Sequence, residues 1–286
     1  PMMINVSKAK GSYIFDKKGN KYLDFVAGVS ACSLGHSNKK ITNAIKKQLD
    51  KYLHVMVYGE FITGPSLELA KLLAKNLPKS LECTYFTNSG TEALEGSLKL
   101  ARRYTGRKKI IAAKNAYHGS TMGALTLMGL EERKKPFEPL IPNVEFIEFN
   151  SCEEINKIDE YTSCVVLETI QGSAGFIKPK ENYLNKVKKR CDKVGALLIL
   201  DEIQTGIGRT GKLFGFQNFN CKPDVIVYGK GLGGGMPIGA FTTSKKKMDV
   251  LHNDPILGHI TTFGANPVIC ASALETLKIV LNTKIM

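Results

Sequence analysis

Lys230 is the residue whose place in the sequence most clearly allows chemistry. It follows the apolar run 225–229 (VIVYG), and glycines stand around it at 229, 231, 233, 234 and 235. Glycines let the backbone approach a bound ligand and adopt positive φ, and a lysine at the end of a buried strand can serve as a nucleophile. A surface lysine in a flexible loop is the alternative, and the apolar run that leads into Lys230 argues against it.

Two carboxylates also end apolar runs. Asp201 follows ALLIL at 196–200, and Glu168 follows CVVL at 164–167. An ionised aspartate at a strand end can pair with a cation. A pyridinium nitrogen is one candidate, because the carboxylate keeps it protonated and able to accept electrons. An acid that simply lies in a turn is the plainer interpretation of Asp201.

A third segment suits an anion. Residues 88–104 (NSGTEALEGSLKLARRY) begin with small polar residues and continue with the spacing of an amphipathic helix. The backbone N–H groups of Ser89, Gly90 and Thr91, together with the helix dipole, would bind a phosphate. An ordinary helix N-cap explains the same residues, so this segment taken alone does not identify a site.

These segments must be positioned by the elements between them. From about residue 82, short apolar runs alternate with helical patterns. Strands are expected near 83–86, 109–113, 144–149, 164–168, 196–202 and 224–229, and helices at 91–104, near 120–134 and near 181–194. This alternation predicts an α/β fold with a mainly parallel sheet flanked by helices. Ligands of such sheets bind at the carboxyl ends of the strands, where four candidate site segments fall, at 88–91, 168–171, 201–204 and 230.

The first part of the chain has a different pattern. Residues 11–25 predict a hairpin of two aromatic-rich strands around 18–20, and helices are expected at 38–53 and 66–77. We therefore expect an N-terminal segment over 1–50, made of a hairpin and a helix. A large domain would follow over 51–286 and end in a helix.

Composition argues against several classes of protein. The net charge of the 286 residues is +14, but the lysines come in pairs and triplets spread along the chain, which indicates a solvated surface and no nucleic-acid partner. The apolar runs are too short for a bilayer and the first residues lack the apolar core of a signal peptide, so no membrane partner is expected. The 7 cysteines form no CxxC pair and predict reduced thiols in a cytoplasmic enzyme, and the 5 histidines lack metal-ligand spacing.

Two glycine motifs match nucleotide sites only in part. GIGRTG at 206–211 has the GxGxxG spacing, but DEIQT separates it from the strand before it and no helical pattern follows. Lys230 is followed by glycine rather than serine or threonine, and Asp224 stands where a P-loop needs its first glycine. The NAD interpretation is therefore weak, and a nucleotide-hydrolysing P-loop is excluded.

The order of the motifs along the chain is more informative than any one of them. It runs SGTEA, YHG, LETIQG, DEIQTGIGRTG, GKGLGGGMPIGA and TTFGANP. This order closely resembles the class III (omega) aminotransferases of the fold-type I pyridoxal-phosphate enzymes, which include ornithine, acetylornithine and 4-aminobutyrate aminotransferases. The resemblance runs from about residue 11 to the last residue. It implies pyridoxal 5'-phosphate as cofactor and transfer of an amino group from an amino acid or omega-amine donor to a 2-oxo acid.

The resemblance also implies roles for individual positions. Lys230 matches the Schiff-base lysine that moves a proton as base and acid, and Asp201 matches the partner of the pyridine nitrogen. The other matching positions are Ser89, Gly90 and Thr91 at the phosphate, Tyr117 stacked on the ring with His118 beside it, Glu168 as an acid near the cofactor, Gln204 toward the ring hydroxyl, and Thr262, which reaches the phosphate of the partner subunit. The resemblance therefore implies a homodimer with shared active sites.

Two serines and the length of the chain depart from the family pattern. Many relatives that act on ornithine, acetylornithine or 4-aminobutyrate have, in place of Ser120, an arginine that grips a substrate carboxylate. Several have, in place of Ser173, a glutamate that gates a second arginine. The stretch YHGST is more similar to amine:pyruvate, β-alanine or diaminopelargonate-type relatives, so the donor and acceptor stay open. Family members also continue into a C-terminal domain, which we expect to be absent here.

Two alternatives to a transaminase follow from the same residues. Aminomutases and decarboxylases share the fold, the cofactor and these motifs, and the residues near 120 and 173 do not separate them. A truncated fragment that binds cofactor without turnover, or that only dimerises, is the second alternative. The presence of Lys230, Asp201 and the phosphate segment argues against it.

Overall fold

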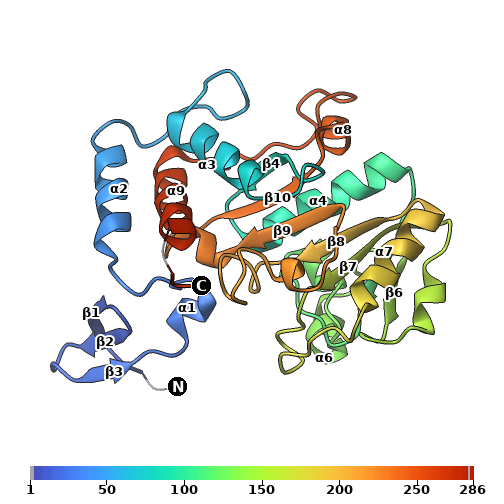
Figure 1. Ribbon diagram of the computed structural model, residues 1–286, viewed down its shortest axis with the longest axis horizontal. Helices are drawn as coiled ribbons and strands as arrows, with labels where there is room; N and C mark the ends of the chain where they lie inside the picture. The colour runs from blue at the N-terminus through green and yellow to red at the C-terminus, as the bar shows by residue number, and fades with distance from the viewer. Residues whose placement is uncertain (1–2, 283) are drawn as a thin grey trace.

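The computed structural model describes residues 3–282 and 284–286, and a seven-stranded sheet runs through its centre (Figure 1). The strand order is β4-β10-β9-β8-β7-β5-β6. The strands are β4 (Cys83–Thr87), β5 (Lys109–Ala113), β6 (Val144–Ile147), β7 (Thr162–Glu168), β8 (Leu197–Asp201), β9 (Val225–Gly229) and β10 (Gly239–Thr243). All strands expected in this part of the sequence are present, and β10 is an addition.

Strand β10 is the one reversal in a sheet that is otherwise parallel. It pairs antiparallel with both β4 and β9, whereas the pairs β9–β8, β8–β7, β7–β5 and β5–β6 are all parallel. Because β10 is antiparallel to both of its neighbours, β4 and β9 run in the same direction. The carboxyl ends of β4, β5, β7, β8 and β9 therefore lie at the same edge of the sheet, and the expected mainly parallel sheet is confirmed.

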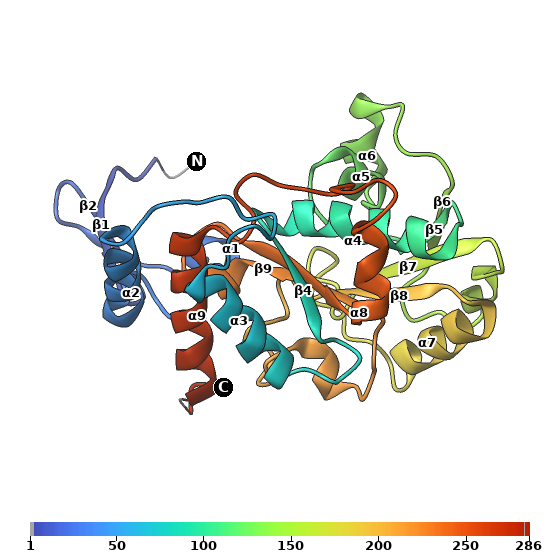
Figure 2. The ribbon, with the colours of Figure 1, turned by 90° about the horizontal axis from the view of Figure 1, so that it is seen from above.

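Alternate residues of the central strands enter two separate cores. In β8, Leu198 and Leu200 belong to one cluster of buried side chains, and Leu197 and Ile199 belong to the other. Helix α7 (Tyr183–Val194) contributes to the first cluster and α4 (Gly90–Thr105) to the second. Figure 2 shows the two helices on opposite sides of the sheet. Because helices cover both faces of the sheet, both sides of its central strands are buried, and their sequences are continuous apolar runs.

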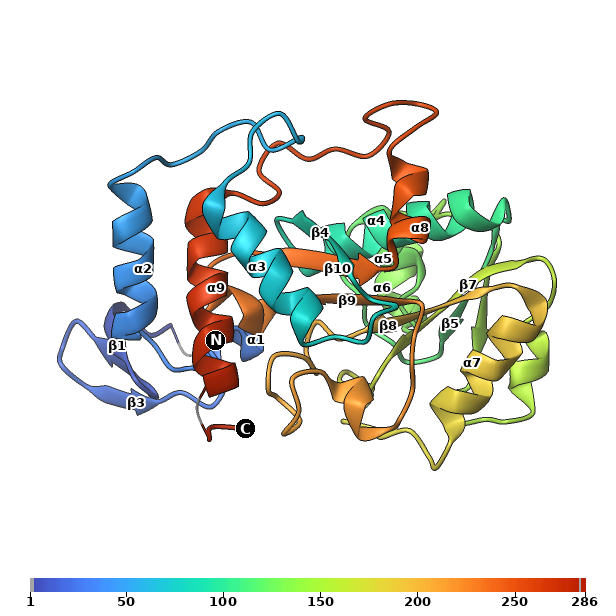
Figure 3. The ribbon, with the colours of Figure 1, turned by 45° about the horizontal axis from the view of Figure 1, so that its top comes forward.

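Three helices stand side by side at one end of the sheet. Helix α9 (Pro267–Asn282) packs against both α3 (Gly64–Lys75) and α2 (Lys39–Leu49), as Figure 3 shows. Asn38 caps α2 by accepting the backbone N–H of Lys40 at 3.1 Å. The helices expected at 38–53 and 66–77 and at the end of the chain are all present, with ends shifted by a few residues.

The first residues form a small antiparallel sheet of β1 (Val6–Lys10), β2 (Tyr13–Asp16) and β3 (Lys21–Leu23). The predicted hairpin is β2 and β3, and β1 extends it. The next element, α1 (Ala27–Ser30), is a left-handed turn with φ of 49°, 60°, 57° and 68° along its residues. Such a backbone is costly for residues with a Cβ, and it persists only where the surrounding structure holds it.

The region 120–134 contains two short helices rather than one. These are α5 (Met122–Thr126) and α6 (Glu131–Lys134), followed along the chain by β6. Gly129 separates them, and a Cβ there would lie 2.0 Å from the backbone nitrogen of Asn115. The chain therefore passes too close to residue 115 for one continuous helix. Helix α8 (Lys245–Met248) is also short, and no helix among the described residues is long and apolar enough to cross a bilayer.

Candidate active site

A cavity of about 300 Å³ lies at the carboxyl edge of the sheet. Its walls come from the start of α4 and from the segments that follow β5, β7, β8 and β9. The predicted site residues that line it are Gly90, Thr91, Tyr117, His118, Glu168, Asp201, Gln204 and Lys230, and the serines at 120 and 173 line it as well. The structure therefore brings the separate sequence motifs to one place.

The start of α4 forms one wall of the cavity. Ser89 is its N-cap, and its Oγ accepts the backbone N–H of Glu92 at 3.3 Å. The first N–H groups of an α-helix have no acceptor within the helix, so together with the helix dipole they form an anion site beside Gly90 and Thr91. A Cβ at Gly90 would lie 2.7 Å from Cδ1 of Ile203, so a larger residue there would require Ile203 to move.

Asp201 and His118 form a buried pair in the cavity wall. Oδ2 of Asp201 lies 2.7 Å from Nδ1 of His118, and Oδ1 accepts the backbone N–H of Ile203 at 2.9 Å. Burial disfavours the imidazolium, but the hydrogen bond to Asp201 and the charges of Asp201 and Glu168 outweigh it and raise the pKa of His118. Nε2 of His118 is buried and has no hydrogen-bond partner among the described residues. The pair thus presents to the cavity a carboxylate that is hydrogen-bonded to an imidazole.

Glu168 reaches the same cavity from the end of β7. Its carboxylate accepts the backbone N–H groups of Tyr117 at 3.2 Å and Gly172 at 3.0 Å. Burial raises the pKa of Glu168, although the charge of His118 acts in the opposite direction. Tyr117 remains 37% exposed, which leaves its ring available to cover a flat ligand. The hydrogen bond from the backbone N–H of Tyr117 to Glu168 holds the turn that carries Tyr117 against the end of β7.

Lys230 follows β9 in a strained backbone conformation. Its φ is 40°, and it begins the short 3-10 helix η4 (Lys230–Gly233). A positive φ at a residue with a Cβ is costly and is concentrated at functional sites. A Cβ at Gly229 would lie 2.8 Å from the carbonyl oxygen of Ile238, so the glycine before the lysine is required by packing.

The predicted Thr262 lies outside this cavity. It is exposed on the segment that precedes α9. Its role toward the phosphate of a partner subunit therefore stays a prediction.

Two further residues, Ser30 and Ser33, contact residues of the DEIQTGIGRTG motif and had no signal in the motifs themselves. Nε2 of Gln204 lies 3.3 Å from Oγ of Ser30, and a guanidinium nitrogen of Arg209 lies 2.8 Å from Oγ of Ser33. These contacts hold the left-handed turn of α1 against Gln204, although the two segments are 174 positions apart. The run of small residues AGVSACS at 27–33 is the only hint in the sequence that this segment packs closely.

The cavity supplies the groups that pyridoxal 5'-phosphate requires. It has an anion site at the start of α4 for the phosphate, a buried carboxylate at Asp201 for a ring nitrogen, and the ring of Tyr117 for an aromatic face. The amine of Lys230 can react with an aldehyde. The chemistry of the residues present therefore fits this cofactor.

A mainly parallel sheet with a lysine after one strand, a carboxylate after its neighbour and an anion site at a helix start defines a fold-type I pyridoxal-phosphate enzyme. The family model described as "Aminotransferase class-III" matches residues 1–286. The chain therefore belongs to the class III aminotransferases, and it is a pyridoxal-phosphate-dependent transaminase.

Known relatives agree with this assignment. The acetylornithine aminotransferase of Archaeoglobus fulgidus is 40% identical over 276 residues, which cover 96% of this chain and 72% of that protein. The putrescine aminotransferase of Pectobacterium atrosepticum is 41% identical over 275 residues, covering 92% of this chain and 58% of that protein. The structure of an ornithine aminotransferase from Toxoplasma gondii, with partial occupancy of the cofactor at its active site, superposes with a TM-score of 0.89 at 32% identity and covers 97% of this chain and 67% of its own.

Proposed function

We propose that Lys230 binds the cofactor as a Schiff base and that the residues of the cavity have the roles their positions suggest. The observation that carries this proposal is that Lys230, Asp201 and the start of α4 border one cavity. Asp201 would hold the ring nitrogen, the N–H groups at Gly90 and Thr91 would bind the phosphate, and Tyr117 would cover one face of the ring. These contacts would fix the cofactor in a single orientation.

The bound cofactor supplies an aldehyde that combines with amines and a ring that accepts the electron pair left by the departing proton. Nζ of Lys230 would accept the proton from the donor's α-carbon as a base and return it as an acid. Asp201 would keep a proton on the ring nitrogen, and His118 would orient Asp201 through the hydrogen bond between Nδ1 and Oδ2. Glu168 fixes the turn of Tyr117 through the backbone N–H it accepts.

The simplest test uses the visible absorption of the loaded protein. With added cofactor, the protein should show an absorption band that Lys230→Ala abolishes, and a donor and a 2-oxo acid should exchange an amino group. Absence of the band in the unaltered protein would overturn the assignment of Lys230. Release of carbon dioxide without consumption of the 2-oxo acid would favour a decarboxylase instead.

The donor is proposed to be an amino acid or an omega-amine, and the acceptor a 2-oxo acid. Ser120 and Ser173 both line the cavity. A serine carries no charge, so neither side chain can form an ion pair with a carboxylate at the far end of a donor. An acetylornithine aminotransferase and a putrescine aminotransferase are about equally identical in sequence to this chain. Sequence identity therefore does not indicate whether the donor carries an acidic or a basic group at its far end. Comparing kcat/KM for donors with carboxylate, neutral and ammonium tails would decide the class.

We also propose that two copies of the chain associate through the segments near 53–62 and 256–263. These segments border a second cavity of about 460 Å³ and carry exposed apolar side chains, among them Phe61, Ile62, Ile256 and Phe263. Thr262 lies in the same region and would reach the phosphate of the partner. Sedimentation analysis should give a dimer, and an intact monomer at micromolar concentration would contradict it.

A cytoplasmic location is the last part of the proposal. The cysteines are all free thiols in the structure, and four of them are buried. Fractionation of cells that produce the protein would test this location directly.

A further inference from the structure

Glu202 is a buried acid directly after Asp201, and the roles proposed above do not use it. Its side chain is 0% exposed. One carboxylate oxygen accepts the hydroxyl of Thr169 at 2.6 Å and the backbone N–H of Phe216 at 2.7 Å. The other accepts the hydroxyl of Thr205 at 2.5 Å and the backbone N–H of Gly215 at 2.8 Å. Four donors from three segments of the chain therefore converge on one carboxylate.

Two of the four donors to Glu202, Thr169 and Thr205, belong to segments that line the cavity. Thr169 follows Glu168 in the chain, and Glu202 follows Asp201. Glu168 and Asp201 are themselves opposite each other in the β7–β8 pairing. Consecutive residues of an extended chain point in opposite directions, so Thr169 and Glu202 lie behind the layer that faces the cavity.

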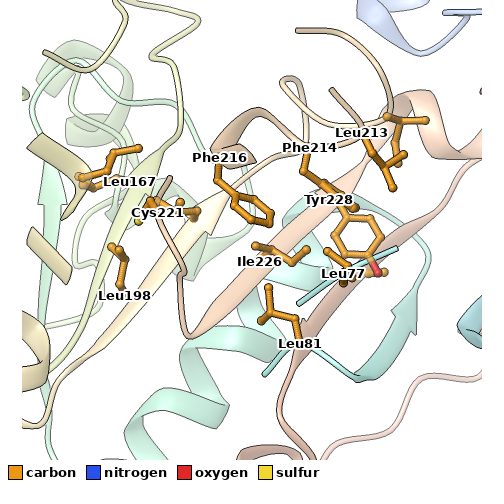
Figure 4. Packing of buried hydrophobic residues seen from close by; sticks show 14 of the residues in the cluster. Leu77, Leu81, Leu167, Leu198, Leu213, Phe214, Phe216, Cys221, Ile226 and Tyr228 are labelled. Atoms are coloured by element: carbon orange, nitrogen blue, oxygen red, sulfur yellow. The ribbon is translucent and has the colours of Figure 1, made fainter. Parts of the chain in front are cut away.

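The third segment held by Glu202 is anchored in the hydrophobic core. Gly215 and Phe216 belong to the 3-10 helix η3 (Gly215–Asn218). Figure 4 shows Phe214 and Phe216 among the buried side chains, and the ring of Phe214 meets that of Tyr228 at 5.2 Å. A Cβ at Gly215 would lie 3.0 Å from a carboxylate oxygen of Glu202, so the backbone approaches the acid closely. Glu202 thus ties the cavity wall to a rigid part of the fold.

We propose that Glu202 is a positioning residue of the transamination site, whose carboxylate fixes the segments that carry Glu168 and Asp201. The inference rests on the role proposed for Asp201. The reason is geometric, because an aspartate that must meet a ring nitrogen has to be held to within a fraction of an ångström. A carboxylate with four acceptor positions can hold several donors at once, whereas an amide of the same shape cannot.

The variant Glu202→Gln tests this inference with little change in volume. Its NH₂ group would face two donors, a threonine hydroxyl and a backbone N–H. The hydroxyl can turn and accept, but the backbone N–H of Gly215 or Phe216 would be left unpaired. We expect kcat to fall by roughly 10- to 100-fold and the dissociation constant of the cofactor to rise about tenfold, with the KM of the donor changed less than about threefold.

A second pair of variants keeps the test valid if Glu202→Gln does not fold. Thr169→Val removes one donor to Glu202, and Thr169→Ser retains it. Cofactor affinity should weaken in the valine variant and be restored in the serine variant. Thr242→Val serves as the matched control, because Thr242 is also 0% exposed and its hydroxyl bonds to Tyr228 at 2.7 Å and Thr84 at 2.8 Å, away from the residues that line the cavity. It should lower the melting temperature without changing cofactor affinity or the position of the absorption band.

The possible outcomes separate the inference from the proposed function. If the unaltered protein transaminates but Glu202→Gln and Thr169→Val bind cofactor and turn over within about twofold of it, the positioning role is wrong. If Thr242→Val weakens cofactor binding as much as they do, the effect is general loss of stability and the inference also fails. If the unaltered protein does not transaminate at all, the proposed function itself is wrong, and the inference that rests on it falls with it.

Discussion

The two ends of strands β8 and β9 each carry a buried or partly buried aspartate, and the two are surrounded differently. At the amino end, Asp224 accepts the backbone N–H of Leu198 at 2.9 Å and pairs with Lys188 at 3.2 Å and Lys247 at 3.4 Å. At the carboxyl end, Asp201 has one ionisable partner, His118, and it borders the cavity. One acid is enclosed by cations of the same chain, and the other faces the cavity.

This difference indicates what each end of the sheet contributes. Lys188 and Lys247 come from α7 and α8, so Asp224 joins helices to strands and supports the fold. The residues at the opposite edge face a cavity and meet strained backbone at Lys230. In a parallel sheet the carboxyl edge is the one where loops can carry a site, while the amino edge is free to be optimised for stability.

The largest expected effect is at Lys230. Lys230→Ala should lower kcat by about 10⁴-fold or more, because it removes the proposed covalent link and the group proposed to move the proton. Lys188→Ala serves as the matched lysine at the other end and should leave kcat within about twofold. Single-turnover kinetics of both variants would measure this, and comparable losses in the two would contradict the division between the ends.

Next comes the comparison of the two aspartates. Asp201→Asn should reduce kcat by about 10²–10³-fold, because it removes the charge proposed to face the ring nitrogen. Asp224→Asn should lower the free energy of unfolding by about 1–3 kcal/mol, because it leaves donors of Lys188 and Leu198 poorly paired. Steady-state rates and denaturant unfolding of each variant would show whether activity and stability separate in this way.

The pH dependence of stability should report the His118–Asp201 pair. The folded-state pKa of His118 is raised above the usual value of 6.5. The contribution of His118 to the free energy of unfolding is therefore fully present below about pH 6.5, and it is lost as the pH rises through the raised pKa. In cofactor-free protein, the difference in unfolding free energy between the unaltered chain and His118→Asn should shrink by at most about 1.4 kcal/mol per pH unit in that range. A difference that does not vary with pH would show that the imidazole is not protonated on folding.

The smallest effect concerns specificity at the mouth of the cavity. Ser120→Arg should raise kcat/KM for donors with a distal carboxylate by about tenfold, because a guanidinium can bind that group with two hydrogen bonds. It should not help donors with a neutral tail. Equal changes for both kinds of donor would show that position 120 does not contact the donor's tail.

Most of the residues predicted for the site line one cavity, and the sequence signals that pointed to them are local. An apolar run followed by glycines indicates that Lys230 ends a buried strand, and small polar residues before a helical pattern indicate the anion site near Gly90. The same periodicity predicted strands β4 to β9 and the covered sheet, since burial on both faces is recorded residue by residue in hydropathy. The order of motifs then indicated the family, which the family match confirms.

Only the tertiary structure decided which residues meet. The pairing of His118 with Asp201, the convergence of donors on Glu202 and the contact of Ser30 with Gln204 join segments 83, up to 33 and 174 positions apart. The first two contacts depend on the order of the strands, because they join the ends of β5, β7 and β8, which are neighbours in the sheet. The hydropathy of a sequence indicates which residues are buried. It does not indicate which partner a buried polar group will have, because that depends on how distant segments pack together.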